Sequence, residues 1–352
     1  MRSPATTLTL LVTVAVLVAA LGSPASATAL RLAGVPEFPD PLSADRASDI
    51  GPILDEVSGE RLFATIDSLS SYWTRCAGEP GNLWAADYIM GRIEELGYEE
   101  AYFDSFWCDA TGGTERNIVF TKQGTASLEG YVVVGAHFDC TSGGEPDARS
   151  PGADDNASGI AGLLEIAQIV EDLPLLRDVV FVCYNVEEVG MLGSEHFVQE
   201  LVAAGDSVFV CLNVDCIGYT DGSWEASIED RPHYRSLARA IAGLMSDYTS
   251  ITPRIMWSRP SDNWPFMEAG IPAIMIWEEP LNPLINGPED WMEHLNQDYA
   301  EDMTRANLAA LLATAELEGT YLPIAPVTFL EETCATEALG LPPGAHAEFR
   351  WW

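Results

Sequence analysis

Acidic and imidazole side chains follow several apolar runs of this sequence, either at once or after a loop. They are His137 and Asp139, Asp154 and Asp155, Glu187 and Glu188, Asp215, and His294 with Asp298. In an open α/β sheet, ligands bind beyond the carboxyl ends of the strands, so we expect these side chains to converge. Converging carboxylates raise one another's pKa unless a positive charge compensates them, and the chain has a single lysine, Lys122. The pattern therefore predicts a metal site, and its mixture of imidazole and carboxylate favours zinc over magnesium or calcium.

The elements that must position these side chains alternate between short apolar runs and helical patterns. We expect strands at 117–121, 131–136, 179–184, 208–214, 255–257 and 273–277, and helices at 60–69, 83–96, 158–170, 234–245 and 302–317. Such alternation is typical of a largely parallel sheet. The sequence thus predicts an α/β fold, a three-layer sandwich whose mixed, mostly parallel central sheet is flanked by helices.

The composition limits the classes of partner. The chain has 352 residues, of which 47% are hydrophobic, and 17 Lys+Arg against 54 Asp+Glu give a formal net charge of −37. The apolar fraction is sufficient for a large core, which excludes disorder for the bulk of the chain. The negative charge argues against a nucleic-acid partner and against an anionic membrane surface.

The N-terminal segment indicates export. Arg2 precedes the apolar run Leu8–Leu21, which is short for a membrane span, and Ala25-Ser26-Ala27 fits a signal-peptidase site. We expect residues 1–27 to be a signal peptide, 28–58 an extended arm or propeptide, 59–322 the catalytic domain and 323–352 a C-terminal tail. The mature protein is then expected to be a secreted, extracellular or periplasmic monomer that is free of the membrane.

Export permits disulfides, and the chain has seven cysteines. Cys76 and Cys108 lie in polar, loop-like surroundings and are one plausible disulfide pair. Three cysteines lie in apolar strand-like runs and are expected to be buried thiols: Cys183, Cys211 and Cys216. Cys140 and Cys334 stay open, and no CxxC motif supports a cysteine-bound zinc.

Six stretches together resemble the bacterial leucyl aminopeptidase type of co-catalytic zinc exopeptidase, metallopeptidase family 28. They are Ala136–Asp139, Pro151–Gly159, Glu187–Ser194, Asn213–Asp215, Ser261–Phe266, and His294 followed by Asp298. They occur in the family's order from about residue 115 to 320. The resemblance implies a phosphorylase/hydrolase-like fold and hydrolysis of N-terminal residues from peptides or protein N-termini.

The resemblance also implies a role for each matching residue. Two zinc ions per chain would be bound by His137, Asp155, Glu188, Asp215 and His294. Asp155 would bridge the ions, Asp215 would share the ion of His137, and His294 would share the ion of Glu188. Glu187 would be the general base that deprotonates the attacking water. Asp139 would hold the His137 imidazole in the required tautomer, and Asp298 would act similarly near His294.

Substrate-binding residues are less well defined by the sequence. The candidates for apolar walls of the site are Met191, Trp257, Trp264, Phe266 and Trp291. The chain has Asn263 where many relatives have His, and Glu293 where some relatives have an aromatic residue. These departures concern substrate preference and rate rather than the predicted ligands.

Other functions remain open at this stage. A glutaminyl cyclase or a carboxypeptidase of the same fold would share several of the ligands. A non-catalytic receptor-like relative would be expected to lose ligands or the base. This chain retains the base Glu187 and all five predicted ligands, which are His137, Asp155, Glu188, Asp215 and His294.

Overall fold

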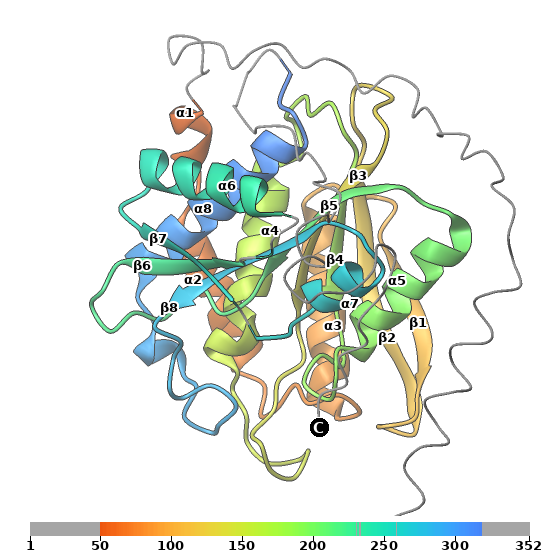
Figure 1. Ribbon diagram of the computed structural model, residues 1–352. Helices are drawn as coiled ribbons and strands as arrows, with labels where there is room; N and C mark the ends of the chain where they lie inside the picture. The colour runs from red at the N-terminus through yellow and green to blue at the C-terminus, as the bar shows by residue number, and fades with distance from the viewer. Residues whose placement is uncertain (1–49, 230, 232–233, 258, 319–352) are drawn as a thin grey trace, which may run out of the picture. The chain divides into compact units, whose positions relative to one another are not determined.

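The computed structural model describes residues 50–229, 231, 234–257 and 259–318 (Figure 1). All of these residues belong to one compact unit. The expected signal peptide, most of the expected arm, the tail from residue 323, His233, His346 and Cys334 lie outside the described residues. Within the described part, no helix is both long and apolar enough to cross a membrane.

One eight-stranded mixed sheet organises the described residues. Its strands are β1 (Tyr102–Cys108), β2 (Gly113–Lys122), β3 (Tyr131–His137), β4 (Val179–Tyr184), β5 (Val208–Val214), β6 (Glu225–Glu229), β7 (Thr252–Met256) and β8 (Ala273–Glu279). Their order across the sheet is β1-β2-β4-β3-β5-β8-β6-β7. The central strands β4, β3, β5 and β8 run parallel, whereas β2 pairs antiparallel with β1 and β4, and β6 pairs antiparallel with β8. The parallel core brings the carboxyl ends of β3, β4 and β5 to one side.

Helices cover both faces of the sheet (Figure 1). They are α1 (Gly51–Leu54), α2 (Gly59–Ser70), α3 (Pro80–Glu95), α4 (Gly159–Val170), α5 (Leu192–Ala204), α6 (Arg235–Tyr248), α7 (Asn263–Glu268) and α8 (Gln297–Thr314), with a π-helical turn η2 at Ala153–Ser158 and a 3-10 turn η3 at Met292–His294. The buried residues of α1 to α4, α6 and α8 share one hydrophobic core. Those of α5 and α7 form a second core with Val133, Val182 and Tyr184 on the opposite face. The predicted three-layer α/β sandwich is confirmed.

Local sequence explains where several of these elements begin and end. β3 and β4 are almost entirely buried, as expected for strands covered on both faces. Ser58 caps α2 by accepting a hydrogen bond from the Arg61 amide, and Asn296 caps α8 by accepting one from the Tyr299 amide. Pro80 occupies the first turn of α3, where its missing N–H costs nothing.

The structure also contains elements that the apolar patterns did not predict. These are α1, α5, α7, β1 and β6. α1 lies within the range expected for an extended arm, yet Ile50, Leu54 and Val57 are buried in the main core. The packed part of the chain therefore already includes residues before 59.

No disulfide joins the cysteines of the described residues. Six are present there and all are free, including Cys76 and Cys108, so the expected disulfide is not formed. Cys108 is the last residue of β1 rather than part of a loop, and it packs with Phe106 and Val186. Cys183, Cys211 and Cys216 are buried as expected.

Arg75 is a fully buried cation that ties together the loops after β3. Its guanidinium donates to the carbonyl of Phe138 at 2.8 Å, to that of Gly152 at 2.8 Å, to that of Pro151 at 2.5 Å and to that of Leu69 at 3.1 Å. Phe138 lies between His137 and Asp139, and Gly152 precedes the Asp154-Asp155 pair. One side chain thus fixes the distance between two loops that carry the predicted ligands.

Replacing Arg75 with Met should lower the free energy of unfolding by about 3 kcal/mol or more, because four buried carbonyl groups lose their donor. Arg75→Lys should be less harmful, since an ammonium group donates three hydrogen bonds. Urea denaturation measures both changes. Arg92→Met is the control, because Arg92 makes only a surface ion pair with Glu95. Equal stability of the Arg75→Met and Arg92→Met variants would contradict the assigned role.

Candidate metal centre

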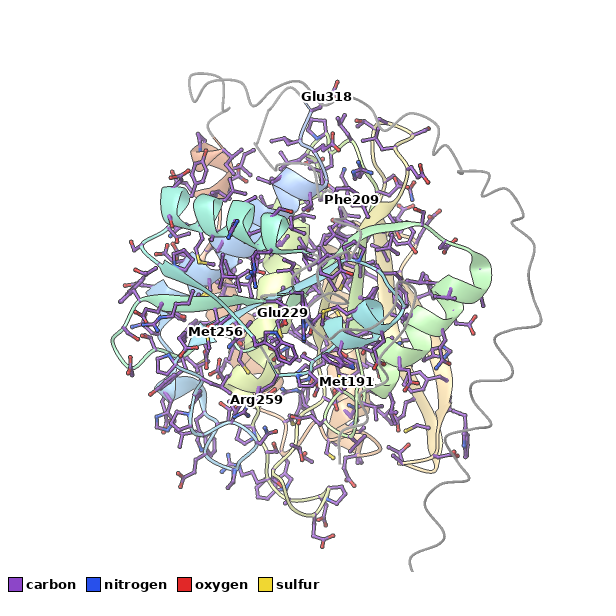
Figure 2. All side chains as sticks on the ribbon, in the orientation of Figure 1. Met191, Phe209, Glu229, Met256, Arg259 and Glu318 are labelled. Carbon is purple, nitrogen blue, oxygen red and sulfur yellow. The ribbon has the colours of Figure 1, made fainter. Side chains whose placement is uncertain are left out.

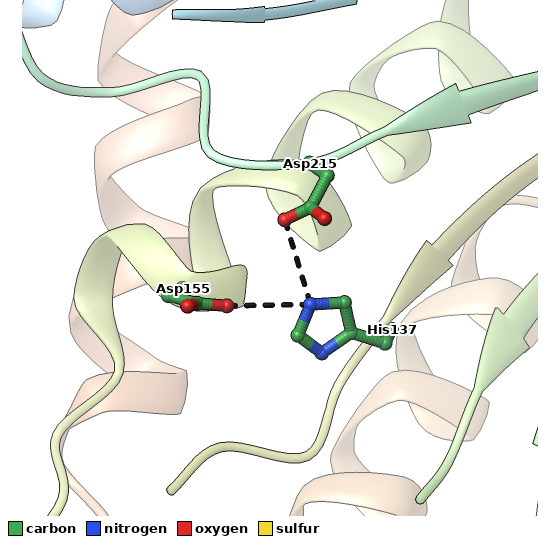
Figure 3. Close-up of side chains that lie close together, drawn as sticks. All are labelled: His137, Asp155 and Asp215. Atoms are coloured by element: carbon green, nitrogen blue, oxygen red, sulfur yellow. Dashed lines mark ion pairs between the residues drawn. The ribbon is translucent and has the colours of Figure 1, made fainter. Parts of the chain in front are cut away.

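Three predicted ligands meet at the carboxyl ends of β3 and β5. The Nε2 atom of His137 lies 3.3 Å from Oδ1 of Asp155 and 3.5 Å from Oδ1 of Asp215 (Figure 3). One ligand atom from each of these residues lies within 4.8 Å of the other two, and among the described residues this is the group with metal-binding potential. His137 ends β3, Asp155 belongs to η2, and Asp215 follows β5.

Burial and mutual charge shift the acid–base behaviour of this cluster. Burial lowers the pKa of His137, but its close contacts with the carboxylates of Asp139, Asp155 and Asp215 raise that pKa well above the usual value. Burial raises the pKa of Asp155, and the nearby imidazole offsets only part of the effect. Burial also acts to raise the pKa of Asp215, but its contacts with His137 and with the Ser261 hydroxyl hold that pKa below its usual value. A divalent cation would compensate the same negative charge that a protonated imidazole compensates.

The geometry of the cluster fits a zinc ion. Two ligands ~2 Å from one tetrahedral ion lie ~3.3 Å apart, which is close to the two distances from His137 Nε2. Oδ1 of Asp215 is buried and accepts no hydrogen bond from any described residue, although buried carboxylate oxygens are normally satisfied. One imidazole nitrogen with two carboxylate oxygens is also a donor set that suits zinc.

Asp139 links the imidazole to the two glutamates. Its Oδ1 lies 3.5 Å from Nδ1 of His137 and accepts a hydrogen bond from the Glu187 amide at 3.1 Å, and its Oδ2 accepts from the Glu188 amide at 3.2 Å. The Nδ1 atom of His137 also lies 3.2 Å from the Asp139 carbonyl oxygen. These contacts leave Nε2 to face Asp155 and Asp215.

The loop that carries Asp155 is held by two further buried side chains. Asp290 accepts hydrogen bonds from the amides of Asp154, at 3.1 and 3.2 Å, and of Asp155, at 3.0 Å. Asn156 donates to the Val214 carbonyl at 3.0 Å and accepts from the Cys216 amide at 3.2 Å, on either side of Asp215. The loop of Asp155 and the loop of Asp215 are therefore fixed to each other.

A glycine is required where this loop begins. Gly152 has φ of +55°, in the left-handed region. A Cβ there would lie 2.6 Å from the Asp155 carbonyl oxygen and 2.8 Å from Nη2 of Arg75. The close packing of Arg75 against the loop leaves no space for a side chain.

Asp215 is oriented by a short polar chain. The Ser261 hydroxyl donates to Oδ2 of Asp215 at 2.7 Å and accepts from Nδ2 of Asn213 at 2.9 Å. Asn213 lies in β5 and Ser261 precedes α7, so two of the stretches that carry the family resemblance meet behind this ligand.

The two glutamates after β4 occupy half-buried positions near the cluster. Burial raises the pKa of Glu187 well above its usual value, and the charges of Asp262 and Asp215 add to the shift. Burial likewise raises the pKa of Glu188, with the charge of Asp155 the largest neighbouring contribution.

Asn286 lies beside Glu188, and His294 lies at an exposed position at the end of η3. The Asn286 amide lies 2.9 and 3.2 Å from the two carboxylate oxygens of Glu188 and donates to both when its nitrogen faces them. His294 ends the 3-10 turn η3 and is exposed, and it does not belong to the metal-binding group found among the described residues. Asp298 lies in the first turn of α8 and is also exposed.

The aromatic and apolar candidates differ in their surroundings. Met191 begins α5 with a positive φ and is half-buried (Figure 2). Trp257 is 63% exposed, and the Arg231 guanidinium lies 4.0 Å from its ring centroid and 5.0 Å from that of Trp264. Phe266 is fully buried in the core with Phe197, so the expectation that it contacts substrate is corrected to a packing role. Arg149 lies 3.8 Å above the ring of half-buried Trp291.

Several residues that organise the site were not identified from the sequence. They are Arg75, Asn156, Asn213, Asn286 and Asp290. Asn156 and Asn213 lie within the stretches that resemble the family, so closer attention to those stretches would have found them. Arg75, Asn286 and Asp290 lie in loops whose path no periodicity predicts.

The sequence is similar to a known peptidase family and to individual aminopeptidases. The model of peptidase family M28 matches residues 117–311. A probable leucine aminopeptidase of Arthroderma benhamiae is 26% identical over 269 residues, which cover 73% of each chain. Aminopeptidase YwaD of Bacillus subtilis is 31% identical over 223 residues, which cover 59% of this chain and 46% of that protein.

Solved structures share the fold. The zinc aminopeptidase BSAP of Bacillus subtilis superposes with a TM-score of 0.63 at 18% identity, over 73% of this chain and 95% of its own. At that identity the likeness concerns the architecture alone, and it agrees with the mixed sheet and its two helical layers.

Asp290→Leu should weaken zinc binding about 10- to 100-fold, because the amides of Asp154 and Asp155 lose the carboxylate that fixes their loop. Asp290→Asn should be milder, since one amide oxygen still accepts a hydrogen bond. Competition with a chromogenic chelator measures the affinity, and circular dichroism checks the fold. The control is Glu289→Gln at the exposed neighbouring position. Zinc binding by Asp290→Leu as tight as in the control would refute the positioning role.

Proposed function

This chain belongs to peptidase family M28, and from that premise we propose that it is a zinc aminopeptidase that removes N-terminal residues from peptides. The observation that carries the proposal is the cluster of His137, Asp155 and Asp215 at the ends of parallel strands. Glu187 lies close enough to the same cluster for its pKa to respond to His137 and Asp215. The similarity to proteins named leucine aminopeptidase and aminopeptidase supports the type of reaction.

Each residue contributes a different part of the chemistry. His137, Asp155 and Asp215 would hold the zinc ion. When bound, zinc lowers the pKa of water and polarises the peptide carbonyl group. Asp139 and Ser261 keep the imidazole and Asp215 in position through the hydrogen bonds described above.

Glu187 is proposed as the general base. Its carboxylate would accept a proton from the attacking water and later donate it to the amine nitrogen that leaves as the C–N bond breaks. Burial is the largest cause of its raised pKa, and a base is most effective when its pKa lies near the working pH. The Asp139 carboxylate holds the Glu187 backbone amide, which limits the positions that the base can adopt.

The proposal includes a second divalent ion between Asp155 and Glu188. Support comes from the electrostatics of Glu188, whose pKa is raised by burial and then by the charge of Asp155. Two carboxylates so placed would be stabilised by a shared cation. Asp155 would then contact both ions.

The charge of the site favours a substrate with a free amino terminus. The groups around His137 include Asp139, Asp155, Asp215, Asp262, Glu187 and Glu188, and all of them are carboxylates. A cationic N-terminus is attracted by this negative field, whereas a C-terminal carboxylate is repelled. Among the wall candidates, Met191, Trp257 and Trp264 remain proposed substrate contacts.

Location and assembly are also proposed. The signal-like segment of residues 1–27 supports export, and the mature protein is proposed to act outside the cytoplasm as a monomer. Free cysteines are compatible with this, because a secreted protein does not need disulfides when its core is large.

The purified protein should release N-terminal residues from peptides and aminoacyl anilides. Acetylation of the substrate's amino group should abolish cleavage, because the acidic site then loses its cationic partner. A chelator should also abolish it, and zinc should restore it. Chromatography of the products from free, acetylated and C-terminally amidated forms of one peptide measures the specificity. Cleavage of the acetylated peptide from its C-terminal end would contradict the assignment.

Glu187→Gln should lower kcat about 10²- to 10⁴-fold while zinc remains bound, because an amide does not accept the proton. Turnover of an aminoacyl anilide and zinc content are measured on the same sample. Glu200→Gln, an exposed change on α5, is the matched control and should behave like the unaltered protein. An active Glu187→Gln variant would remove Glu187 from the mechanism.

A further inference from the structure

Arg149 differs from most arginines of this acidic protein, because no carboxylate of the described residues neutralises it. The chain has a formal net charge of −37, and most arginines in its described part form an ion pair with a carboxylate. Arg149 is exposed and contacts aromatic rings instead. A guanidinium that stays unpaired among so many carboxylates is available to an anion from outside the chain.

Two tryptophan rings hold the Arg149 guanidinium. Its Cζ lies 3.8 Å from the ring centroid of Trp291 and 5.3 Å from that of Trp73, distances at which a cation is attracted to an aromatic face. The Trp73 indole N–H donates to the Asp147 carbonyl at 3.0 Å, and the Ser150 amide donates to the Trp73 carbonyl at 3.0 Å. Trp73 therefore also fixes the chain on both sides of Arg149.

Contacts with ring faces leave the hydrogen-bonding edge of the guanidinium available. The N–H donors of an arginine lie in the plane of the group, and a carboxylate accepts two of them side by side. Trp73 is 62% exposed, and Arg149 is exposed as well, so a ligand can reach this edge from the solvent. The arrangement thus suits a carboxylate better than a cation or an apolar group.

The tryptophans lie close in sequence to residues that hold the loop of Asp155. Trp291 follows Asp290, whose carboxylate accepts a hydrogen bond from the Asp155 amide at 3.0 Å. Trp73 precedes the buried Arg75, which joins the loops that carry the predicted ligands. Consecutive Cα atoms lie about 3.8 Å apart and an extended residue spans up to ~3.6 Å, so a peptide of about two to four residues reaches from the cluster to Arg149.

We propose that Arg149, held by Trp73 and Trp291, is a subsite that binds a carboxylate of the peptide substrate while the amino terminus lies at the acidic metal centre. The proposal rests on the proposed function, because it takes the substrate to be a peptide with its N-terminus at that centre. The carboxylate is either the C-terminal one of a short peptide or that of an acidic side chain beyond the cleaved bond. In both cases the negative centre and the positive subsite attract opposite ends of one substrate.

The test compares leucylglycylglycine with its C-terminal amide as substrates of the zinc-loaded mature protein. The net charge alone would favour the amide, because an acidic protein repels a carboxylate. With the subsite, kcat/KM for the free carboxylate form should exceed that for the amide about tenfold or more, the effect of one charge-assisted hydrogen bond. The difference should lie mainly in KM, since the contact is the same in the ground state and the transition state.

Variants of the subsite identify the groups responsible. Arg149→Gln should abolish the preference for the carboxylate form, and Arg149→Lys should keep part of it. Trp73→Leu should raise KM for the carboxylate form, because the guanidinium loses one of the rings that hold it. Arg239→Gln, a change at an exposed position of α6, is the matched control and should keep the full preference. Circular dichroism checks the fold of each variant.

Two further sets of peptides distinguish the sources of the carboxylate. Among peptides of increasing length with free C-termini, one length should be preferred if the subsite binds the end of the chain. Among C-terminally amidated peptides with an aspartate at successive positions, one position should be preferred if the subsite binds a side chain. Either preference supports the proposal when Arg149→Gln abolishes it.

The proposal is overturned if neither a free C-terminus nor an acidic side chain improves cleavage, or if Arg149→Gln retains the preference. Isothermal titration calorimetry of the same peptides with the zinc-loaded Glu187→Gln variant measures the preference without cleavage. Binding that depends on Arg149, in a protein whose unaltered form cleaves no peptide, would refute the proposed function alone. Cleavage of N-terminal residues without any preference for a carboxylate would refute this inference alone.

Discussion

Negative charge is concentrated where the parallel strands β3, β4 and β5 end, and this concentration constrains the rest of the molecule. Carboxylates from several separate segments surround one imidazole, and burial deprives them of water. Such an arrangement is unfavourable unless a cation compensates it. The protonated imidazole of His137 can provide the compensating charge. A divalent ion at the same place would compensate the negative charge more fully. The proposed peptidase chemistry requires that such an ion replace the proton on the His137 imidazole.

The scaffold keeps these acidic side chains in place through hydrogen bonds to the backbone of their loops rather than through cations paired with the carboxylates. Arg75 donates only to carbonyl oxygens, and in doing so it joins the loop of His137 to the loop of Asp155. Asn156 joins the latter to the segment around Asp215. Because the helical layers bury these loops from one side, the ligands are positioned before any ion arrives. Such preorganisation is what a metal-dependent hydrolase requires.

The elements that could be predicted from the sequence are those marked by a pattern within a short stretch of residues. The apolar runs of β3, β4, β5 and β8 mark buried parallel strands, and the residues that follow them include the cluster of His137, Asp155 and Asp215. β1 was missed because exposed and buried side chains are mixed along this edge strand, so that no continuous apolar run marks it. Trp107, for example, is exposed. Asp290 and Asn286 were missed because the loop after β8 has no periodicity, and its path depends on tertiary contacts. His294 follows the same loop and is exposed, so its predicted role as a ligand stays a prediction.

The most direct test of the central claim is a crystal structure of the zinc-loaded protein with diffraction data collected above and below the zinc absorption edge. The account predicts an anomalous difference peak within ~2.0–2.2 Å of His137 Nε2 and of carboxylate oxygens of Asp155 and Asp215. An active, zinc-containing crystal whose peak lies away from these three residues would contradict it.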